Sequence, residues 1–181
     1  MSEAFRHVDE RVVHQGHIVK FVEATFESPT GDRFQRDVVR HPGAAAAVPL
    51  HDDGTVTMVR QFRAPHDAFV LELPAGKLDV DGEDPEAAMH RELAEEVGLE
   101  AARMERLVSV ALSPGFCDEV IHIYLATGLS EVPSSAHGLE EEYMEVERVP
   151  LDDVPGMIER GQLVDGKSII GLLETLRRRV R

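Results

Sequence analysis

Apolar and polar residues alternate along most of the chain, and this period of two predicts a protein rich in β-strands. Strand patterns cover residues 17–26, 32–41, 44–50, 55–62, 69–73, 104–112, 119–126 and 143–149. A Pro-Thr-Gly-Asp turn signal at 29–32 joins the first two of them. A His-Asp-Asp-Gly signal at 51–54 predicts that 44–50 and 55–62 form a hairpin.

Three segments show the period of a helix instead, at about 85–97, 152–160 and 168–180. The first has readable ends, because Asp84 is a suitable N-cap, Pro85 suits the first helical position and Gly98 suits a left-handed C-terminal residue. Strands with interspersed helices indicate an α/β fold, or α+β. The pattern by itself does not order the strands.

Length and composition place the chain among single globular domains. Its 181 residues, 43% of them hydrophobic, are enough for a sizeable core. The first residues lack the apolar stretch of a signal peptide, and no run is long enough to span a bilayer. The single cysteine, Cys117, cannot form an internal disulfide, so the cytoplasm is the expected location.

The formal net charge of −15 argues against a nucleic-acid polymer as partner, since no basic stripe offsets it. Without a membrane-spanning run, no membrane is expected as partner either. A small anionic substrate is compatible with this charge if metal ions join carboxylates to phosphate oxygens.

The helix at 85–97 carries its acidic residues on one side. At about 100° per residue, Glu92, Glu95 and Glu96 fall within an arc of roughly 100°, opposite the apolar residues between them. Carboxylates three and four residues apart repel each other, which favours a cation between them. Mg²⁺ and Mn²⁺ take oxygen ligands of this kind. The alternative is a solvated helix face.

Residues 91–99 read Arg-Glu-Leu-Ala-Glu-Glu-Val-Gly-Leu, with seven residues between Glu83 and Arg91. This pattern resembles the signature of the Nudix hydrolases, which cleave nucleoside diphosphates linked to another moiety. One departure is that six residues, 77–82, follow Gly76 before Glu83 where the family has five. A loop tolerates such an insertion cheaply. By this resemblance, Arg91 is expected to pair with Glu83.

Further segments resemble the ADP-ribose pyrophosphatase branch of that family, namely 38–44, 59–63, 71–76 and 113–115. In that branch a proline lies some 15 residues beyond the signature, and Pro114 stands 15 residues after Leu99. A Ser-Pro-Gly segment is also ordinary turn chemistry.

The resemblance implies an α/β/α sandwich around a mixed sheet and metal-dependent hydrolysis of ADP-ribose to AMP and ribose 5-phosphate. Glu92 and Glu96 are then the expected metal ligands, helped by the backbone carbonyl of Ala75. Glu95 would share a further ion or orient a ligand. Mg²⁺ is the expected cofactor, with Mn²⁺ as the alternative ion.

In this branch a late glutamate acts as general base or organises the metal-bound water. The matching acidic segment is 138–142, in which Glu141 is favoured and Glu140 and Glu142 are alternatives. The competing interpretation is an acidic surface loop.

Four residues are candidates for substrate contact. Arg40 and Arg63 are expected to meet phosphate or ribose, Glu72 a base or ribose hydroxyl, and Pro114 lies in the turn that the branch shares. An ordinary surface salt bridge is the alternative for each arginine.

Members of the branch are commonly homodimers whose N-terminal strands cross to the partner. Residues 1–41 are therefore expected to form a strand-rich dimerisation arm, and residues 42–181 the Nudix hydrolase domain. The alternative functions are hydrolysis of another nucleoside diphosphate sugar and a non-catalytic Nudix-fold module that senses a nucleotide. A structural Ca²⁺- or Mg²⁺-binding domain would explain only the carboxylates.

Overall fold

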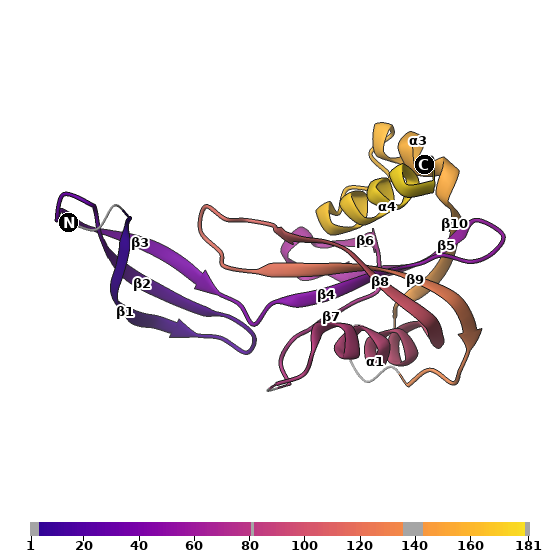
Figure 1. The fold of residues 1–181 in the computed structure, drawn as a ribbon, viewed down its shortest axis with the longest axis horizontal. Helices are drawn as coiled ribbons and strands as arrows, with labels where there is room; N and C mark the ends of the chain where they lie inside the picture. Colours follow the sequence, from indigo (N-terminus) through magenta and orange to yellow (C-terminus); the bar gives the residue numbers. More distant parts are fainter. Residues whose placement is uncertain (1–3, 81, 136–142, 180–181) are drawn as a thin grey trace. The chain divides into compact units, whose positions relative to one another are not determined.

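The computed structural model describes residues 4–80, 82–135 and 143–179 (Figure 1). The chain divides into two compact units, one of Met1–Gly43 with Ala111–Val120 and one of Ala44–Val110 with Ile121–Arg181.

The smaller unit is an antiparallel sheet in the order β1 (Arg6–Gln15), β2 (Lys20–Glu27) and β3 (Arg33–Arg40). The segment after residue 111 docks on β3, where the Val39 N–H donates to the Phe116 carbonyl (2.7 Å) and the Val39 carbonyl accepts from the Asp118 N–H (3.1 Å). Strand β1 was not predicted, because it is exposed along nearly its whole length and has no apolar face to alternate with.

The larger unit contains two sheets. One has the order β7 (Ala75–Lys77), β4 (Ala44–Pro49), β9 (Val120–Glu131) and β8 (Leu99–Ala111), and the other the order β10 (Glu145–Pro150), β5 (Thr55–Arg63) and β6 (Ala68–Glu72). Because β4 runs parallel to β9 and antiparallel to β7, the first sheet is mixed.

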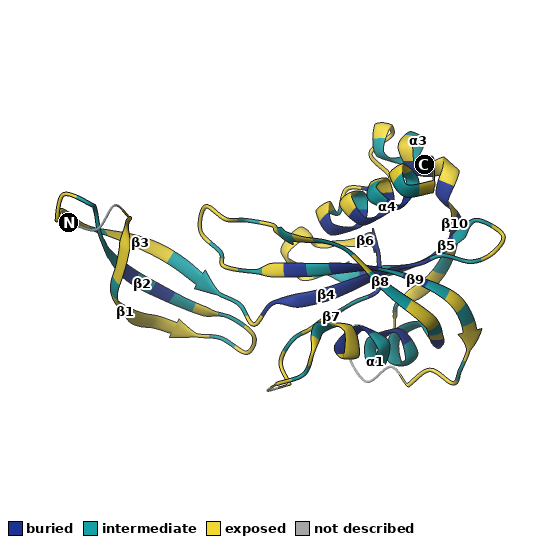
Figure 2. Cartoon of the chain, viewed as in Figure 1, coloured by how far each residue is buried: buried dark blue, intermediate teal, exposed yellow. Residues whose placement is uncertain are grey.

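Two long helices, α1 (Pro85–Val97) and α4 (Gly166–Arg179), cover opposite sides of the sheets (Figure 1). Strand β4 is buried at every position and forms the middle of this sandwich (Figure 2). Its residues alternate between the two layers, since Ala45 and Ala47 pack against Leu93 of α1 whereas Val48 packs against Leu172 of α4. A mixed sheet between two helical layers is the predicted α/β arrangement.

The hairpin predicted for 44–50 and 55–62 is confirmed only at its turn. The His51 N–H donates to the Thr55 carbonyl (2.9 Å) and Leu50 forms an antiparallel bridge with Val56, but β4 and β5 then enter different sheets. The reason is that β4 already has β7 on one edge and β9 on the other. A turn signal reports the reversal of the chain and carries no information about the pairing beyond it.

The predicted helix ends of α1 are confirmed. The Asp84 side chain accepts from the Glu86 N–H (2.9 Å), Pro85 opens the helix, and Gly98 closes it with φ 64°. The helix predicted at 152–160 is shorter, with a 3₁₀ turn at Leu151–Asp153 before α3 (Val154–Glu159). In the described part of the chain, no helix has the length and apolar character needed to cross a membrane.

Candidate active site

The acidic face of α1 is organised around the guanidinium of Arg91. Its Nε and one Nη lie 3.3 and 3.2 Å from the Glu83 carboxylate, which confirms the expected pair. Its other Nη lies 2.9 Å from Glu92 and 3.0 Å from Glu95. The hydrogen bond to Glu83 is the largest of the effects that raise the pKa of Arg91 above its ordinary value. Arg91 therefore connects Glu83 in the loop before α1 to the carboxylates of Glu92 and Glu95 on the helix.

Strand β7 lies against the same face of α1. The Ala75 N–H donates to Glu96 Oε2 at 3.1 Å, and the Glu92 side chain lies directly over Gly76. A Cβ atom on Gly76 would stand 2.1 Å from Glu92 Cδ, so that only a glycine leaves this carboxylate in place. Hence the backbone of residues 75–76 and the carboxylates of Glu92 and Glu96 lie side by side.

The carboxylates of Glu92 and Glu96 suit a hard divalent cation, since their ligating atoms are oxygens. Within the described ranges, no three His, Cys, Asp or Glu side chains are spaced to hold a metal ion by themselves. Water, backbone oxygen and substrate oxygen are further ligands that such an ion takes beside Glu92 and Glu96. The glycine at position 76 makes room for such a site beside the strand.

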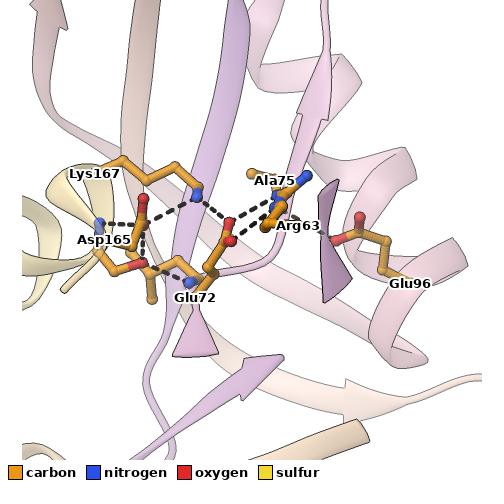
Figure 3. A network of polar contacts seen from close by, with 8 residues as sticks. Arg63, Glu72, Ala75, Glu96, Asp165 and Lys167 are labelled. Atoms are coloured by element: carbon orange, nitrogen blue, oxygen red, sulfur yellow. Dashed lines mark hydrogen bonds and ion pairs between the residues drawn. The ribbon is translucent and has the colours of Figure 1, made fainter. Parts of the chain in front are cut away.

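A second polar group lies at the ends of β5 and β6. Arg63 binds Glu72 through two parallel hydrogen bonds of 2.7 Å each, and Lys167 contacts the same carboxylate (Figure 3). The Glu72 side chain is only 4% exposed, that of Lys167 7% and that of Arg63 37%. Burial opposes ionisation of Glu72, but the hydrogen bonds and charges of its two cations lower its pKa below the ordinary value. The Glu72 carboxylate is therefore buried, charged and doubly paired.

The first turn of α4 holds this group from the other side. Asp165 accepts hydrogen bonds from Lys167 Nζ (3.0 Å), from the Ser168 N–H (3.0 Å) and from the Ser168 hydroxyl (2.5 Å). The Ser168 hydroxyl in turn accepts from the Leu73 N–H (2.7 Å). Sequence reasoning did not single out these α4 residues. The one available signal was an Asp that precedes the helical period and suits an N-cap.

The predicted site residues fall into three places. The larger unit contains six of them close together, namely Ala75, Glu92, Glu95, Glu96, Arg63 and Glu72. In the smaller unit, Arg40 binds Glu10 (2.6 Å) and Asp118 (3.0 Å). Pro114 lies there too, in a turn closed by the Cys117 N–H and the Ser113 carbonyl (2.9 Å). The three candidates for general base, Glu140, Glu141 and Glu142, lie outside the described residues.

Comparison with known proteins agrees with this geometry. The NUDIX domain family matches residues 40–169. A methanol dehydrogenase activator from Bacillus methanolicus is 39% identical over 160 residues, which cover 88% of this chain and 86% of that protein. An ADP-ribose pyrophosphatase from Bacillus subtilis (strain 168) is 36% identical over 156 residues, which cover 86% and 84% respectively. The crystal structure of an ADP compounds hydrolase matches with a TM-score of 0.79 at 21% identity, over 96% of this chain and 92% of that one, and confirms the fold class.

Proposed function

The chain belongs to the NUDIX family, and on that premise we propose that it is a pyrophosphohydrolase that cleaves ADP-ribose to AMP and ribose 5-phosphate. One observation carries the proposal, namely that the carboxylates of Glu92 and Glu96 lie against the backbone of residues 75–76. This is the arrangement that the reaction needs, because oxygen donors must gather a cation beside an anionic substrate.

We assign the metal to the acidic face of α1. Glu92 and Glu96, with the backbone carbonyl of Ala75, would hold a divalent ion, and Glu95 would share a further ion or orient a ligand. When bound, the ion neutralises phosphate oxygens and lowers the pKa of a bound water. Mg²⁺ is the proposed ion and Mn²⁺ the alternative. Arg91 keeps a structural role, since it fastens the preceding loop to the helix.

Water has to lose a proton as it attacks the pyrophosphate. We propose Glu141 as the acceptor of that proton, with Glu140 and Glu142 as the alternatives. A carboxylate suits this role when it stands within hydrogen-bond reach of the attacking water.

The substrate is proposed to meet Arg63 first, since this guanidinium is part-exposed beside the carboxylate face. Two of its five N–H donors bind Glu72, and the other three have the geometry to bind a phosphate. Glu72 then acts on the substrate through Arg63, because its own carboxylate is buried and paired. Arg40 and Pro114 stay as proposed substrate contacts.

The finer properties are proposals of the same kind. We propose a cytoplasmic homodimer in which residues 1–41 form the dimerisation arm and residues 42–181 the hydrolase domain. The strand-rich smaller unit supports this division. Its exposed β1 edge would suit pairing with a second copy.

The deciding experiment is hydrolysis of ADP-ribose with Mg²⁺ and with excess chelator, alongside ADP-glucose, NADH and a nucleoside triphosphate. We expect metal-dependent release of AMP, fastest from ADP-ribose. Faster turnover of another substrate would keep the chemistry and move the specificity to that substrate, which for ADP-glucose means another nucleoside diphosphate sugar. Binding of ADP-ribose without turnover of any substrate would instead support the nucleotide-sensing module.

A further inference from the structure

Lys167 carries a buried positive charge to which the proposed reaction gives no role. Its side chain is 7% exposed, and its ammonium contacts Glu72 and Asp165, which lie on either side of it. Burying an ammonium is costly, and a buried ion pair seldom adds net stability over an apolar core of the same shape. A role in organising the neighbouring groups is therefore a better reason for a lysine here than stability alone.

The charges around Lys167 form an alternating row. Asp165, Lys167, Glu72 and Arg63 follow one another, each in contact with the next (Figure 3). The row begins at the start of α4 and ends on the guanidinium of Arg63, which is the most exposed of the four side chains. Because Lys167 offsets part of the charge of Glu72, the Arg63 end keeps positive charge for an anion.

The row is held in place by close packing of α4 on the sheets. At Gly171, a Cβ would come within 3.0 Å of Leu73 Cδ1 and Ile123 Cγ2, so this glycine lets the helix approach closely. That approach lets the Ser168 hydroxyl reach the Leu73 N–H. The same strand end leads through Pro74 into the backbone of residues 75–76 at the carboxylate face. The start of α4 thus contacts the Glu72–Arg63 pair directly and supports the backbone of residues 75–76 through Leu73.

We infer that Lys167 is a positioning residue for pyrophosphate binding, which shares Glu72 with Arg63 so that the guanidinium stays oriented and available to the anionic substrate. The inference rests on the proposed function. Without Lys167, Arg63 would be the only cation in contact with a buried carboxylate, and it would be held more tightly to Glu72 than to a ligand. The effect belongs to binding, because none of these atoms is placed at the bond that breaks.

The test compares Lys167→Met with a control on the same helix. We expect Lys167→Met to raise KM for ADP-ribose about tenfold while kcat stays within about threefold, since the binding that is lost is the same in the ground state and in the transition state. The control, Thr175→Val, removes a buried hydroxyl that donates to the Gly171 carbonyl one turn away (2.8 Å). It should lower the melting temperature and leave KM unchanged. Equal KM values for wild type and folded Lys167→Met would overturn the inference.

A double variant keeps the test valid if the single one does not fold. Glu72→Gln with Lys167→Met removes one charge of each sign, and so does not leave a buried carboxylate with one of its two cations missing. If Lys167 acts through Glu72, this double variant should bind ADP-ribose as weakly as Glu72→Gln alone. A further loss of more than about threefold in the double variant would show that Lys167 acts by another route.

Binding measured in chelator separates the inference about Lys167 from the proposed hydrolase function. Calorimetric titration of ADP-ribose into metal-free protein reads the affinity without turnover. A wild-type protein that binds ADP-ribose in chelator but does not hydrolyse it when Mg²⁺ is supplied refutes the proposed function, whereas weaker binding to Lys167→Met still supports the inference. Normal hydrolysis by wild type with undiminished affinity in Lys167→Met refutes the inference and leaves the function intact.

Discussion

Gly76→Ala is the sharpest test of the metal site, because it moves one carboxylate by a known amount. The new Cβ would stand 2.1 Å from Cδ, 2.2 Å from Cγ and 2.3 Å from Oε1 of Glu92. Non-bonded carbon atoms approach to about 3.5 Å. The Glu92 side chain must therefore move by more than about 1 Å, away from the position beside Glu96 that we assign to metal binding.

The expected loss follows from that displacement. A misplacement of about 1 Å at a reacting centre can cost about 100-fold in rate, or about 2.7 kcal/mol of activation free energy. We expect kcat to fall by about this factor. The Mg²⁺ concentration for half-maximal activity should rise, since one charged ligand is displaced.

Stability should change much less than activity. The backbone of Gly76 does not lie in the left-handed region, so alanine fits it without strain. The displaced atoms belong to the far end of a flexible side chain. Overpacking lowers the free energy of unfolding by about 1–3 kcal/mol. Alanine also restricts the unfolded chain, which raises the free energy of unfolding by about 0.4–1 kcal/mol and offsets part of that loss. The melting temperature, followed by circular dichroism, should show a shift of only a few degrees.

Gly156→Ala is the matched control. Its Cβ would stand 2.8 Å from Nη1 of Arg160, so it also displaces the end of a charged side chain. The site is in α3, where alanine favours the helix. We expect unchanged kcat and unchanged Mg²⁺ dependence. If Gly76→Ala kept kcat within about threefold of wild type, the position of Glu92 against β7 would have no part in catalysis.

Three other measurements examine the remaining assignments. Glu96→Gln should lower kcat at least about 100-fold without changing the melting temperature, as one charged ligand is lost; near-normal kcat would remove Glu96 from the metal site. In steady-state kinetics, Glu141→Gln should lower kcat more than Glu140→Gln or Glu142→Gln; three equal and mild effects would identify an acidic surface loop. Burial opposes the charge of Glu72, yet Arg63 and Lys167 hold its pKa below the ordinary 4.5. The charged carboxylate therefore stabilises the folded protein fully above pH 4.5, and this stabilisation is lost as the pH falls further and Glu72 takes up a proton. The melting temperature should therefore drop below pH 4.5, and Glu72→Gln should make the drop smaller; an equal drop would contradict the pairing.

The parts of the fold that sequence predicted are those fixed by neighbouring residues. Helix α1 was delimited correctly because Asp84, Pro85 and Gly98 act on the backbone within one turn of themselves. The Arg91–Glu83 pair was likewise predictable through the family resemblance, since both residues lie in one short motif.

The parts that sequence missed depend on distant contacts. Lys167 and Glu72 stand 95 residues apart, and so do Ser168 and Leu73, which places both contacts beyond the reach of any local pattern. The lysine looked like one more polar residue near a helix start. For the same reason the predicted pairing of β5 with β4 holds only at the turn, because the whole sheet decides which strands occupy the edges of β4.

The carboxylates of α1 carry more negative charge than the neighbouring side chains neutralise. Repulsion among them predicted a bound cation, and the protein supplies part of that charge itself through Arg91, which contacts Glu83, Glu92 and Glu95. One guanidinium against three carboxylates still leaves a formal excess of two negative charges, and Glu96 adds another beside the Ala75 N–H. Arg91 therefore holds the helix face together without neutralising it, and the charge that is left over favours a divalent ion over a monovalent one.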